Sequence, residues 1–467
     1  MSRKGRNHNL GFVPKKQGYT MSSQAPVSQR FVGIRPRIKQ TASGEARPTQ
    51  VCILGQGDFK IVYDLDSEQA ELDFVLGVFP TGWRKVNEGE DLSAFRAHHI
   101  QCDAEDKPIK VPSGFDGLKA GDIVSMVMGG SGDLFAFALS RKGEEIGAVV
   151  TRVTPFVFSN KRAASSKDDD ASLLASLVMS EPGLFNSVYV RDRKIVLVRK
   201  CQQLRVDTMK ARIGCEQRLR QRFIGKIFCS TEGLFPEGAI EKEFDEHKAN
   251  DKVLQALIAE ESAADKELAK AVKATEVWEE ILSEVQGLGP AIAARLISVI
   301  QDVRRFETAP KLRKYLGVHV QADGRFPRRR AGELAGWSNE GRQALYLLID
   351  QFNRRPDSVW GKKFLENKLM YQAKYPHPHL VFVHEGKEQV MALVPGTFEK
   401  KGSKYSVTID DKVVEVTGKL RHFKGHIHKM TGWRTASQFV DWFFSEWWKL
   451  ERRLAKPDIQ TEGEKAA

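Results

Sequence analysis

The sequence lacks the patterns that mark secreted, membrane-spanning and metal-binding proteins. Its five cysteines form an odd, scattered set without a CxxC pair, which is typical of reduced thiols in a cytoplasm. No apolar run is long enough to cross a bilayer, and the first residues, MSRKGRNHNLGF, contain no signal-peptide hydrophobic region. We therefore expect a cytoplasmic protein without a membrane partner. The cysteines are Cys52, Cys102, Cys201, Cys215 and Cys229.

Histidines that could bind metal are also poorly arranged. His98, His99 and Cys102 lie in HHIQC, and His377 and His379 lie in HPHPH. Neither cluster has a second pair of zinc ligands at a suitable spacing. We interpret them as ordinary loop histidines and expect no metal site and no cofactor, with Mg²⁺ required only if the chain is an active metal-dependent enzyme.

Length and charge indicate a multidomain protein with a polyanionic partner. A chain of 467 residues is too long for one compact core, so two or three domains are expected. Its hydrophobic content of 41% is that of a folded protein. The net charge of +13 favours a polyanion, and nucleic acid is the commonest one.

The N-terminal part divides into a basic arm and a domain of alternating elements. Residues 1–48 are rich in Lys, Arg, Gln, Ser and Pro, with Glu45 as the only acid, so we expect a disordered basic arm. Residues 49–193 begin with strands and continue with alternating β and α segments, which predicts an α/β domain. The expected strands lie within 51–66, 73–79, 122–132 and 146–158.

The remainder is mostly helical. Two long helices separated by the loop STEGLFPEGAIEKEF predict an antiparallel coiled-coil arm, and such arms usually mediate self-association. We therefore expect a homo-oligomer. The Trp and Phe residues of the closing amphipathic helix are expected to pack in a core rather than stack on bases. The expected segments are the coiled-coil arm 194–276, a helical domain 277–375, a β-rich insertion 376–424, the closing helix 425–456 and a polar tail 457–467.

A glycine-rich turn in VQGLGPAIAARLISVI is the sharpest local motif. Gly287 and Gly289 flank a leucine just before a helix, which is the pattern of a helix-hairpin-helix. Such glycines let the backbone approach a phosphate, and the next helix presents its N–H groups to it. Basic residues cluster nearby and recur in the first arm helix. The candidate nucleic-acid contacts are Gly287, Gly289, Arg295, Arg304, Arg305, Lys311, Arg313, Arg328, Arg329, Arg330, Arg205 and Arg212.

An acidic triplet in KDDDASLLASL admits two interpretations. Asp168, Asp169 and Asp170 precede an apolar helix with interleaved small residues. Carboxylates at a helix start accept the unpaired N–H groups there and complement the helix dipole. The alternative is that they are metal ligands of a nuclease; for the triplet taken alone, the helix start is the favoured interpretation.

In their order along the chain, these segments resemble the DEDD transposases and recombinases that include the Piv-type invertases and related RNA-guided insertion-sequence transposases. The resemblance covers roughly 49–455 and rests on the acidic segment, the block VMGGSGDLFAFALSRKGEEIGAVVTRVTPFVF, the segment GLGPAIAARLISVIQDVRRFETAPKLRKYLGV, and GHIHKM before the aromatic helix. It implies a RuvC-like (RNase H-type) domain, a coiled-coil arm and a helical transposase domain with a helix-hairpin-helix and a β-hairpin insertion. It also implies DNA and a structured guide RNA as partners.

The residues that carry the chemistry of that family are largely replaced. The family has an aspartate directly after a valine-glycine-isoleucine run in its first strand. The run VCIL is aligned with that strand, so Leu54 stands at the position of the aspartate. Gly129 stands in place of the glutamate, and Lys167 in place of the first of two aspartates in the last motif. Asp170 matches the second of them. The nucleophilic serine is absent, with Asp323 before Gly324 in its segment.

Three function hypotheses follow from these replacements. The first is a transposase-derived nucleic-acid-binding protein, associated with the nucleoid, that does not cleave strands. The second is an active metal-dependent recombinase in which Asp168 or a neighbouring carboxylate joins Asp170, with Ser338 as nucleophile. The third is a structural subunit of a ribonucleoprotein.

Overall fold

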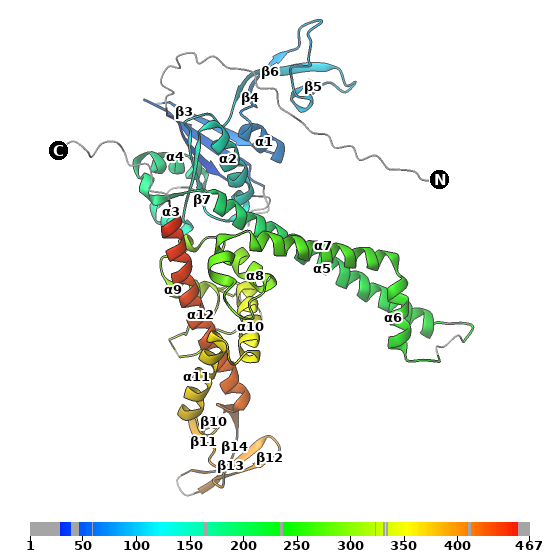
Figure 1. Ribbon diagram of the computed structural model, residues 1–467, viewed down its shortest axis with the longest axis vertical. Coiled ribbons are helices and arrows are strands. Elements are labelled where there is room, and N and C mark those ends of the chain that lie inside the picture. The colour runs from blue at the N-terminus through cyan, green and yellow to red at the C-terminus, as the bar shows by residue number, and fades with distance from the viewer. Residues whose placement is uncertain are drawn as a thin grey trace, which may run out of the picture.

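The structure is a computed structural model, which describes residues 29–38, 46–57, 59–162, 166–233, 237–322, 324–329, 332, 335–409 and 412–455. The predicted arm residues 1–28 and 39–45 and the predicted tail 457–467 lie outside them. The molecule is elongated: an α/β domain stands at one end of a column, a helical domain continues it, and a small sheet forms the far end (Figure 1). A pair of helices projects sideways from the junction. The predicted combination of mixed α/β and helical parts is confirmed.

The α/β domain is built on a six-stranded sheet of order β3-β2-β1-β7-β8-β9. β1 pairs in parallel with β7, and β7 in parallel with β8, whereas the remaining neighbours are antiparallel. The three central strands therefore end at the same edge of the sheet. The strands are β1 (Phe31–Arg35), β2 (Thr49–Leu54), β3 (Lys60–Leu65), β7 (Ile123–Val127), β8 (Val149–Val153) and β9 (Phe185–Ser187).

Helices cover both faces of this sheet. Val32 and Ile34 of β1 are fully buried against α1 (Glu68–Val75) and α2 (Asp133–Ile146). The alternate residue, Gly33, faces α4 (Asp170–Ser180), which lies with α3 (Pro155–Arg162) on the other face. A Cβ on Gly33 would lie 2.0 Å from the carbonyl oxygen of Ala171. The small residues in KDDDASLLASL thus let the helix approach the central strand closely.

Two expectations for this domain were wrong, and one strand is shorter than its predicted segment. β1 lies inside the segment predicted to be a disordered arm, because a short apolar stretch buried on both faces is hidden by its basic surroundings. Residues 73–79 were predicted as a strand, but α1 extends to Val75, with the Ser67 hydroxyl accepting a hydrogen bond from the Ala70 N–H. The strand predicted within 146–158 ends at Val153, and the end of that segment belongs to the helix α3.

A small antiparallel sheet projects from this domain, between α1 and β7 in the sequence (Figure 1). Its order is β4-β6-β5. The strands are β4 (Phe79–Lys85), β5 (Gln101–Cys102) and β6 (Pro108–Asp116), and the single turn η1 (Ala97–His99) precedes β5.

The sideways projection consists of α5 (Val190–Phe228) and α7 (Lys252–Lys273), which pack side by side. The helices run antiparallel, because Arg205 pairs with Asp265 whereas the later Arg212 pairs with the earlier Glu261. The predicted connecting loop contains a further helix, α6 (Ile240–Asn250). The second long helix ends at Lys273, close to the predicted end of the arm at 276, and a π-helical turn (Trp278–Leu282) follows.

The helical domain contains the largest apolar core. α8 and α10 of this domain pack against each other, and the last helix crosses α9, α10 and α11. Phe439, Phe443 and Trp447 of that helix are almost fully buried, as the expectation of a packing role predicts. The helices are α8 (Pro290–Ile300), α9 (Ala309–Tyr315), α10 (Asn339–Arg354), α11 (Val359–Lys374) and α12 (Lys424–Leu454), and the single turn η6 (Val303–Arg305) precedes α9.

A five-stranded antiparallel sheet lies between α11 and α12, at the far end of the column (Figure 1). Its order is β11-β10-β14-β13-β12, and it has a small apolar core of its own. Within the described ranges, no helix is both long and apolar enough to cross a membrane. The strands are β10 (His379–His384), β11 (Lys387–Ala392), β12 (Phe398–Lys401), β13 (Lys404–Ile409) and β14 (Lys412–Arg421).

Candidate functional site

The carboxyl edge of the central strands brings together residues from four segments. In the parallel pair β1 and β7, Ile34 lies beside Met126, so Arg35 and Gly129 follow at the same edge. The start of α4 reaches this edge as well, because Arg35 and Asp168 form an ion pair. Leu54 pairs with Phe31 and therefore lies at the opposite edge. The structure thus contradicts the predicted equivalence of Leu54 with a residue of this site.

Arginines occupy this edge alongside the acidic triplet. The Arg35 guanidinium, 12% exposed, lies 3.6 Å from an Asp168 oxygen, and Arg47 approaches the same oxygen to 2.9 Å. The Asp170 carboxylate, largely buried, accepts two hydrogen bonds from Arg162, at 2.7 and 2.6 Å. Both Asp168 and Asp170 therefore have arginine partners, although the Asp168 side chain is 66% exposed.

Lys167 and Asp169, the remaining members of the acidic segment, point to solvent. Both are exposed, in a single turn (η3) that leads into α4. The Ser166 hydroxyl accepts a hydrogen bond from the Asp168 N–H at 3.2 Å and so caps that turn. The segment therefore begins a helix, but its cap is Ser166, and the side chain of Asp169, the N-cap of α4, accepts no capping hydrogen bond.

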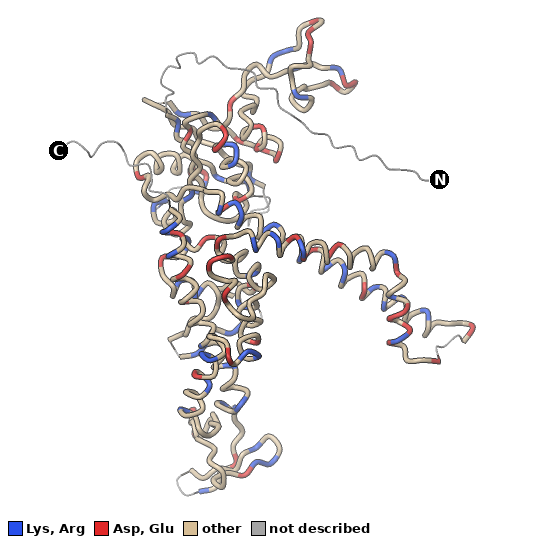
Figure 2. Tube along the Cα trace, viewed as in Figure 1, with Lys and Arg blue, Asp and Glu red and all other residues tan. Residues whose placement is uncertain are grey.

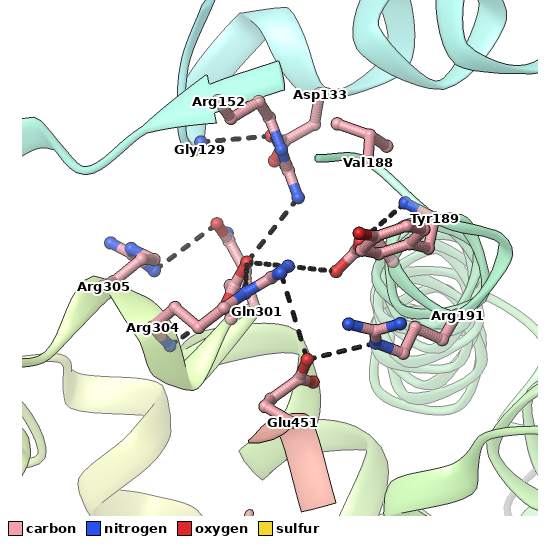
Figure 3. Close-up of polar contacts among 12 residues, drawn as sticks. Gly129, Asp133, Arg152, Val188, Tyr189, Arg191, Gln301, Arg304, Arg305 and Glu451 are labelled. Carbon is pink, nitrogen blue, oxygen red and sulfur yellow. Dashed lines mark hydrogen bonds and ion pairs between the residues drawn. The ribbon is translucent and has the colours of Figure 1, made fainter. Parts of the chain in front are cut away.

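Gly129 has a left-handed backbone, with φ of +86°, at the end of β7. Its N–H donates a hydrogen bond of 3.1 Å to the buried carboxylate of Asp133. The same carboxylate pairs with Arg152 at 3.3 Å and with Arg199 at 2.6 Å. Asp133, a possible displaced ligand, is therefore neutralised by two arginines. Figure 3 shows Asp133 and Arg152 above the Gln301 and Arg304 segment.

A buried network of ion pairs continues from this point into the helical domain (Figure 3). Arg304, 8% exposed, pairs with Asp302 at 2.8 Å and with Asp192 of α5 at 2.5 Å. Glu451 of α12 pairs with Arg191 at 3.0 Å. The α/β domain, the arm and two parts of the helical domain therefore meet in one cluster of charges.

The pKa values in this network reflect burial and the surrounding charges. Burial raises the pKa of Asp192, against the attraction of Arg304. Burial is also the largest influence on Asp302, but the charges of Arg304 and Arg152 and the hydrogen bonds from Arg304 together outweigh it and lower the pKa of that carboxyl. Glu451 has a raised pKa, again because of burial. Removal of Arg304 would leave buried carboxylates without their common partner, and breaking such pairs is costly.

The glycine turn precedes α8 as the sequence predicts. Gly287 has φ of +91°, Leu288 is buried, and the exposed Gly289 is the N-cap of α8, with Pro290 in the first turn. A Cβ on Gly287 would lie 3.0 Å from the Gln351 Cβ, whereas one on Gly289 would meet nothing within 4 Å. Gly289 therefore opens the helix N-terminus to solvent.

Several arginines predicted to contact nucleic acid instead have partners within the protein. Arg304 belongs to the buried network, and Arg305 donates a 3.0 Å hydrogen bond to the Ile300 carbonyl. In the arm, Arg205 lies 2.9 Å from Asp265, and Arg212 pairs with Glu261 and Glu216. The sequence did not reveal these internal partners, and contact of the four arginines with nucleic acid stays a prediction.

Other predicted contacts keep accessible charge. Arg295 of α8 is half-buried without an ion pair to a described acid, and burial together with the nearby Arg205 lowers its pKa. Arg328 and Arg329 are exposed. Arg330 and Asp323 lie outside the described residues.

Lys311 and Arg313 are partly engaged. Lys311, 46% exposed, pairs with Glu307 and lies 4.1 Å from the centre of the Phe156 ring. Arg313 lies 3.2 Å from Asp441. Their charges are therefore partly neutralised within the protein.

Ser338 caps a helix. Its hydroxyl accepts a hydrogen bond of 3.1 Å from the Gly341 N–H, at the start of α10. The hydroxyl therefore pairs with an otherwise unpaired N–H group at the helix start, a structural role that needs no reactive serine.

Sequence reasoning missed Arg35, Arg47 and Arg162. A signal for the first was present: Val32, Gly33 and Ile34 form a valine-glycine-isoleucine run, and Arg35 follows it. The partners of Arg47 and Arg162 lie far along the chain or across a loop and left no local pattern.

One segment of the chain matches a family of known proteins. Residues 279–324, from the π-helical turn through α8 and α9, match the model of the Transposase IS116/IS110/IS902 family. The match supports a transposase or recombinase family assignment, which the sequence had predicted. No curated protein matches the chain.

Proposed function

We propose, from the transposase-family match of residues 279–324, that this chain is a transposase-derived nucleic-acid-binding protein that does not cleave strands. The observation that carries the proposal is the arginine-lined carboxyl edge of β1, β7 and α4. A RuvC-like, RNase H-type site needs several carboxylates that converge on divalent metal ions, which activate the nucleophile and stabilise the leaving oxygen.

The sheet supports a RuvC-like interpretation with a corrected alignment. Its first three strands are antiparallel, and β1 continues in parallel with β7 and β8. The valine-glycine-isoleucine run at 32–34 ends β1, so we assign the first family aspartate position to Arg35 instead of Leu54. The glutamate position remains Gly129, and the last motif remains Lys167 and Asp170.

The residues at this edge do not fit Mg²⁺. This ion takes oxygen ligands in near-octahedral geometry, but Arg35 and Gly129 offer no side-chain oxygen. Asp170 is held by Arg162, and Asp168 by Arg47 and Arg35. A guanidinium beside these carboxylates supplies the positive charge that a metal ion would otherwise supply. We therefore derive no metal-dependent step for this chain.

Nucleic acid is proposed to bind along the helical domain. The turn at Gly287 and Gly289 corresponds to a helix-hairpin-helix, with the α8 N-terminus facing a phosphate. Arg295 and the exposed pair Arg328 and Arg329 add positive charge. The resemblance to RNA-guided transposases extends the proposal to a structured guide RNA and to self-association through a coiled coil of α5 and α7.

The two other hypotheses receive less support. An active recombinase would need free carboxylates and a free serine, whereas Asp133 and Ser338 are engaged in an ion-pair network and a helix cap. A ribonucleoprotein subunit would use the same basic surfaces for RNA alone. Sequencing of the nucleic acid that co-purifies with the full chain, after separate DNase and RNase treatment, distinguishes a ribonucleoprotein subunit from a DNA-binding protein.

Two assays test the proposal together: cleavage of supercoiled plasmid and binding to duplex DNA. We expect the full chain to bind duplex DNA but to leave supercoiled plasmid intact in Mg²⁺ or Mn²⁺. The Asp170→Asn variant should behave in the same way in both assays. Metal-dependent nicking that disappears in Asp170→Asn would overturn the proposal, and so would an absence of binding to both DNA and RNA.

A further inference from the structure

A second cluster of chemically active side chains lies away from the sheet edge. The Asp73 carboxylate, at the C-terminal end of α1, faces two consecutive histidines of η1. The His99 Nε2 atom lies 2.7 Å from one Asp73 oxygen, and the His98 Nε2 atom lies 2.9 Å from the same oxygen. The three ligand atoms all lie within 4.8 Å of one another.

This grouping of three possible metal ligands is mostly buried. Among the described residues, it is the only set of three His, Cys, Asp or Glu side chains close enough to share a metal ion. The side chains of Asp73 and His99 are 3% exposed, whereas that of His98 is 38% exposed. The cluster therefore has a buried floor and one side that opens to solvent.

We propose that Asp73, His98 and His99 form a Zn²⁺ site that fastens the small β4-β6-β5 sheet to the α/β domain. Two imidazole nitrogens and one carboxylate oxygen are ligands that Zn²⁺ accepts, and a water molecule can complete four-coordination from the open side. Hard ions such as Mg²⁺ and Ca²⁺ prefer all-oxygen sets, so the two imidazoles favour a borderline metal.

The small sheet has a physical need for such a fastening. Apart from Phe79, which packs against the core of the α/β domain, no described residue of the sheet's three strands belongs to an apolar cluster, although Val111 is buried. A short three-stranded sheet without a core gains little stability from burial, and small units of this kind commonly depend on a metal or a disulfide. The five-stranded sheet at the other end of the molecule has its own core, and its described residues include no such cluster.

The present contacts of Asp73 show what the ion would replace. Arg96 approaches one Asp73 oxygen to 3.3 Å, and the Gln69 amide donates to the same oxygen at 3.1 Å. Arg96 has a side chain that is 42% exposed and can turn toward solvent as the ion enters. Gln69 can remain as a hydrogen-bond donor that orients the carboxylate, a common feature around metal ligands.

Zinc titration of the full chain tests the proposal. After treatment with EDTA and dialysis, calorimetry with Zn²⁺ should show one equivalent bound, and the melting temperature should rise because only the folded state offers the site. Co²⁺ bound in place of Zn²⁺ should give the visible absorption expected of a four-coordinate site. His98→Asn keeps an N–H donor near Asp73 but removes the imidazole, so binding should weaken by more than about tenfold.

His384→Asn is the matched control, because His384 lies on β10 in the other small sheet. It should bind Zn²⁺ as the wild type does. In EDTA, His98→Asn should melt as the wild type does, and zinc should raise only the wild-type value. Absence of stoichiometric binding to the wild type, or an unchanged affinity in His98→Asn, would overturn the proposal.

Discussion

The Arg35 guanidinium lies 3.6 Å from the carboxylate of Asp168, across the edge where β1 ends and α4 begins. In an RNase H-type nuclease, the corresponding edge must hold cations against several carboxylates. Here the side chain of Arg35, the last residue of β1, provides a fixed positive charge at this edge. The arginine places positive charge against Asp168, so the edge presents less negative charge to an approaching phosphate backbone.

The first prediction concerns the acidic triplet. Asp170→Asn should lower the free energy of unfolding by about 1–3 kcal/mol, because it removes a charged acceptor of two hydrogen bonds from Arg162. The exposed Asp169→Asn is the control and should change it by less than about 0.5 kcal/mol. Denaturant unfolding measures both. A melting-temperature rise in Mg²⁺ that Asp170→Asn abolishes would show instead that carboxylates form a metal site.

The glycine turn provides a second test. Gly289→Ala should weaken duplex binding severalfold while the fold is retained, because its Cβ meets no atom of the protein. Gly183→Ala, in an equally open position, should bind as the wild type does. Gly287→Val is a poor probe: its left-handed backbone and the Gln351 contact predict a loss of about 1–2 kcal/mol of stability. Unchanged affinity of folded Gly289→Ala would exclude the turn as a phosphate contact.

The arginines divide into two classes by their partners. Arg295→Gln should reduce DNA affinity and lower the slope of log affinity against log salt by about one, with little effect on melting. Arg212→Gln should instead destabilise the arm, since Arg212 bridges to Glu261 of α7, and should leave the salt slope unchanged. Salt-dependent fluorescence anisotropy with parallel melting curves separates the two. An unchanged salt slope in Arg295→Gln would rule out a phosphate contact.

The histidine cluster around His422 predicts that the free energy of unfolding depends on pH. His422 stacks on Tyr375 with ring centres 3.7 Å apart, and burial together with His379, His426, Arg421 and Lys374 lowers its pKa to about 4. Between about pH 6.5 and pH 4 the unfolded chain binds this proton and the folded chain does not, so stability falls as the pH falls.

Hydrogen exchange of the five-stranded sheet as a function of pH measures this effect. Protection should decrease below about pH 6.5 in the wild type. His422→Gln should flatten that dependence, whereas His384→Gln, on the same sheet, should keep it. Equal slopes for wild type and His422→Gln would assign the pH response to other groups.

The last prediction concerns self-association of the arm. Basic and acidic residues alternate along both arm helices (Figure 2), yet Leu197 and Leu204, a heptad apart on α5, are 48% and 46% exposed. Leu197→Glu with Leu204→Glu should shift the particle toward monomer in light scattering, because charge would replace an apolar contact face. Gln217→Glu with Gln221→Glu adds equal charge on the same helix and should not. An unchanged oligomer in the leucine variant would place the interface elsewhere.

Local patterns were sufficient for much of the architecture. The alternation in 49–66, the glycine turn before α8 and the aromatic periodicity of α12 reflect interactions between near neighbours, so their elements could be predicted. β1 could not: its five residues are surrounded by basic sequence, and only pairing with β2 and β7 makes them a central strand. The helix α1 was missed because apolar runs of that length suit either a strand or a buried helix.

By itself, the sequence determined the family resemblance, the helical and α/β parts and the absence of an oxygen ligand at Gly129, because these depend on residue identity and short-range periodicity. Only the tertiary structure decided which charges are available. It placed Arg35 against Asp168, buried Arg304 between Asp302 and Asp192, and brought Asp73 to His98 and His99. The physical reason is that an ion pair or a ligand set depends on distances of a few ångströms between residues far apart in the chain, and no local pattern specifies those distances.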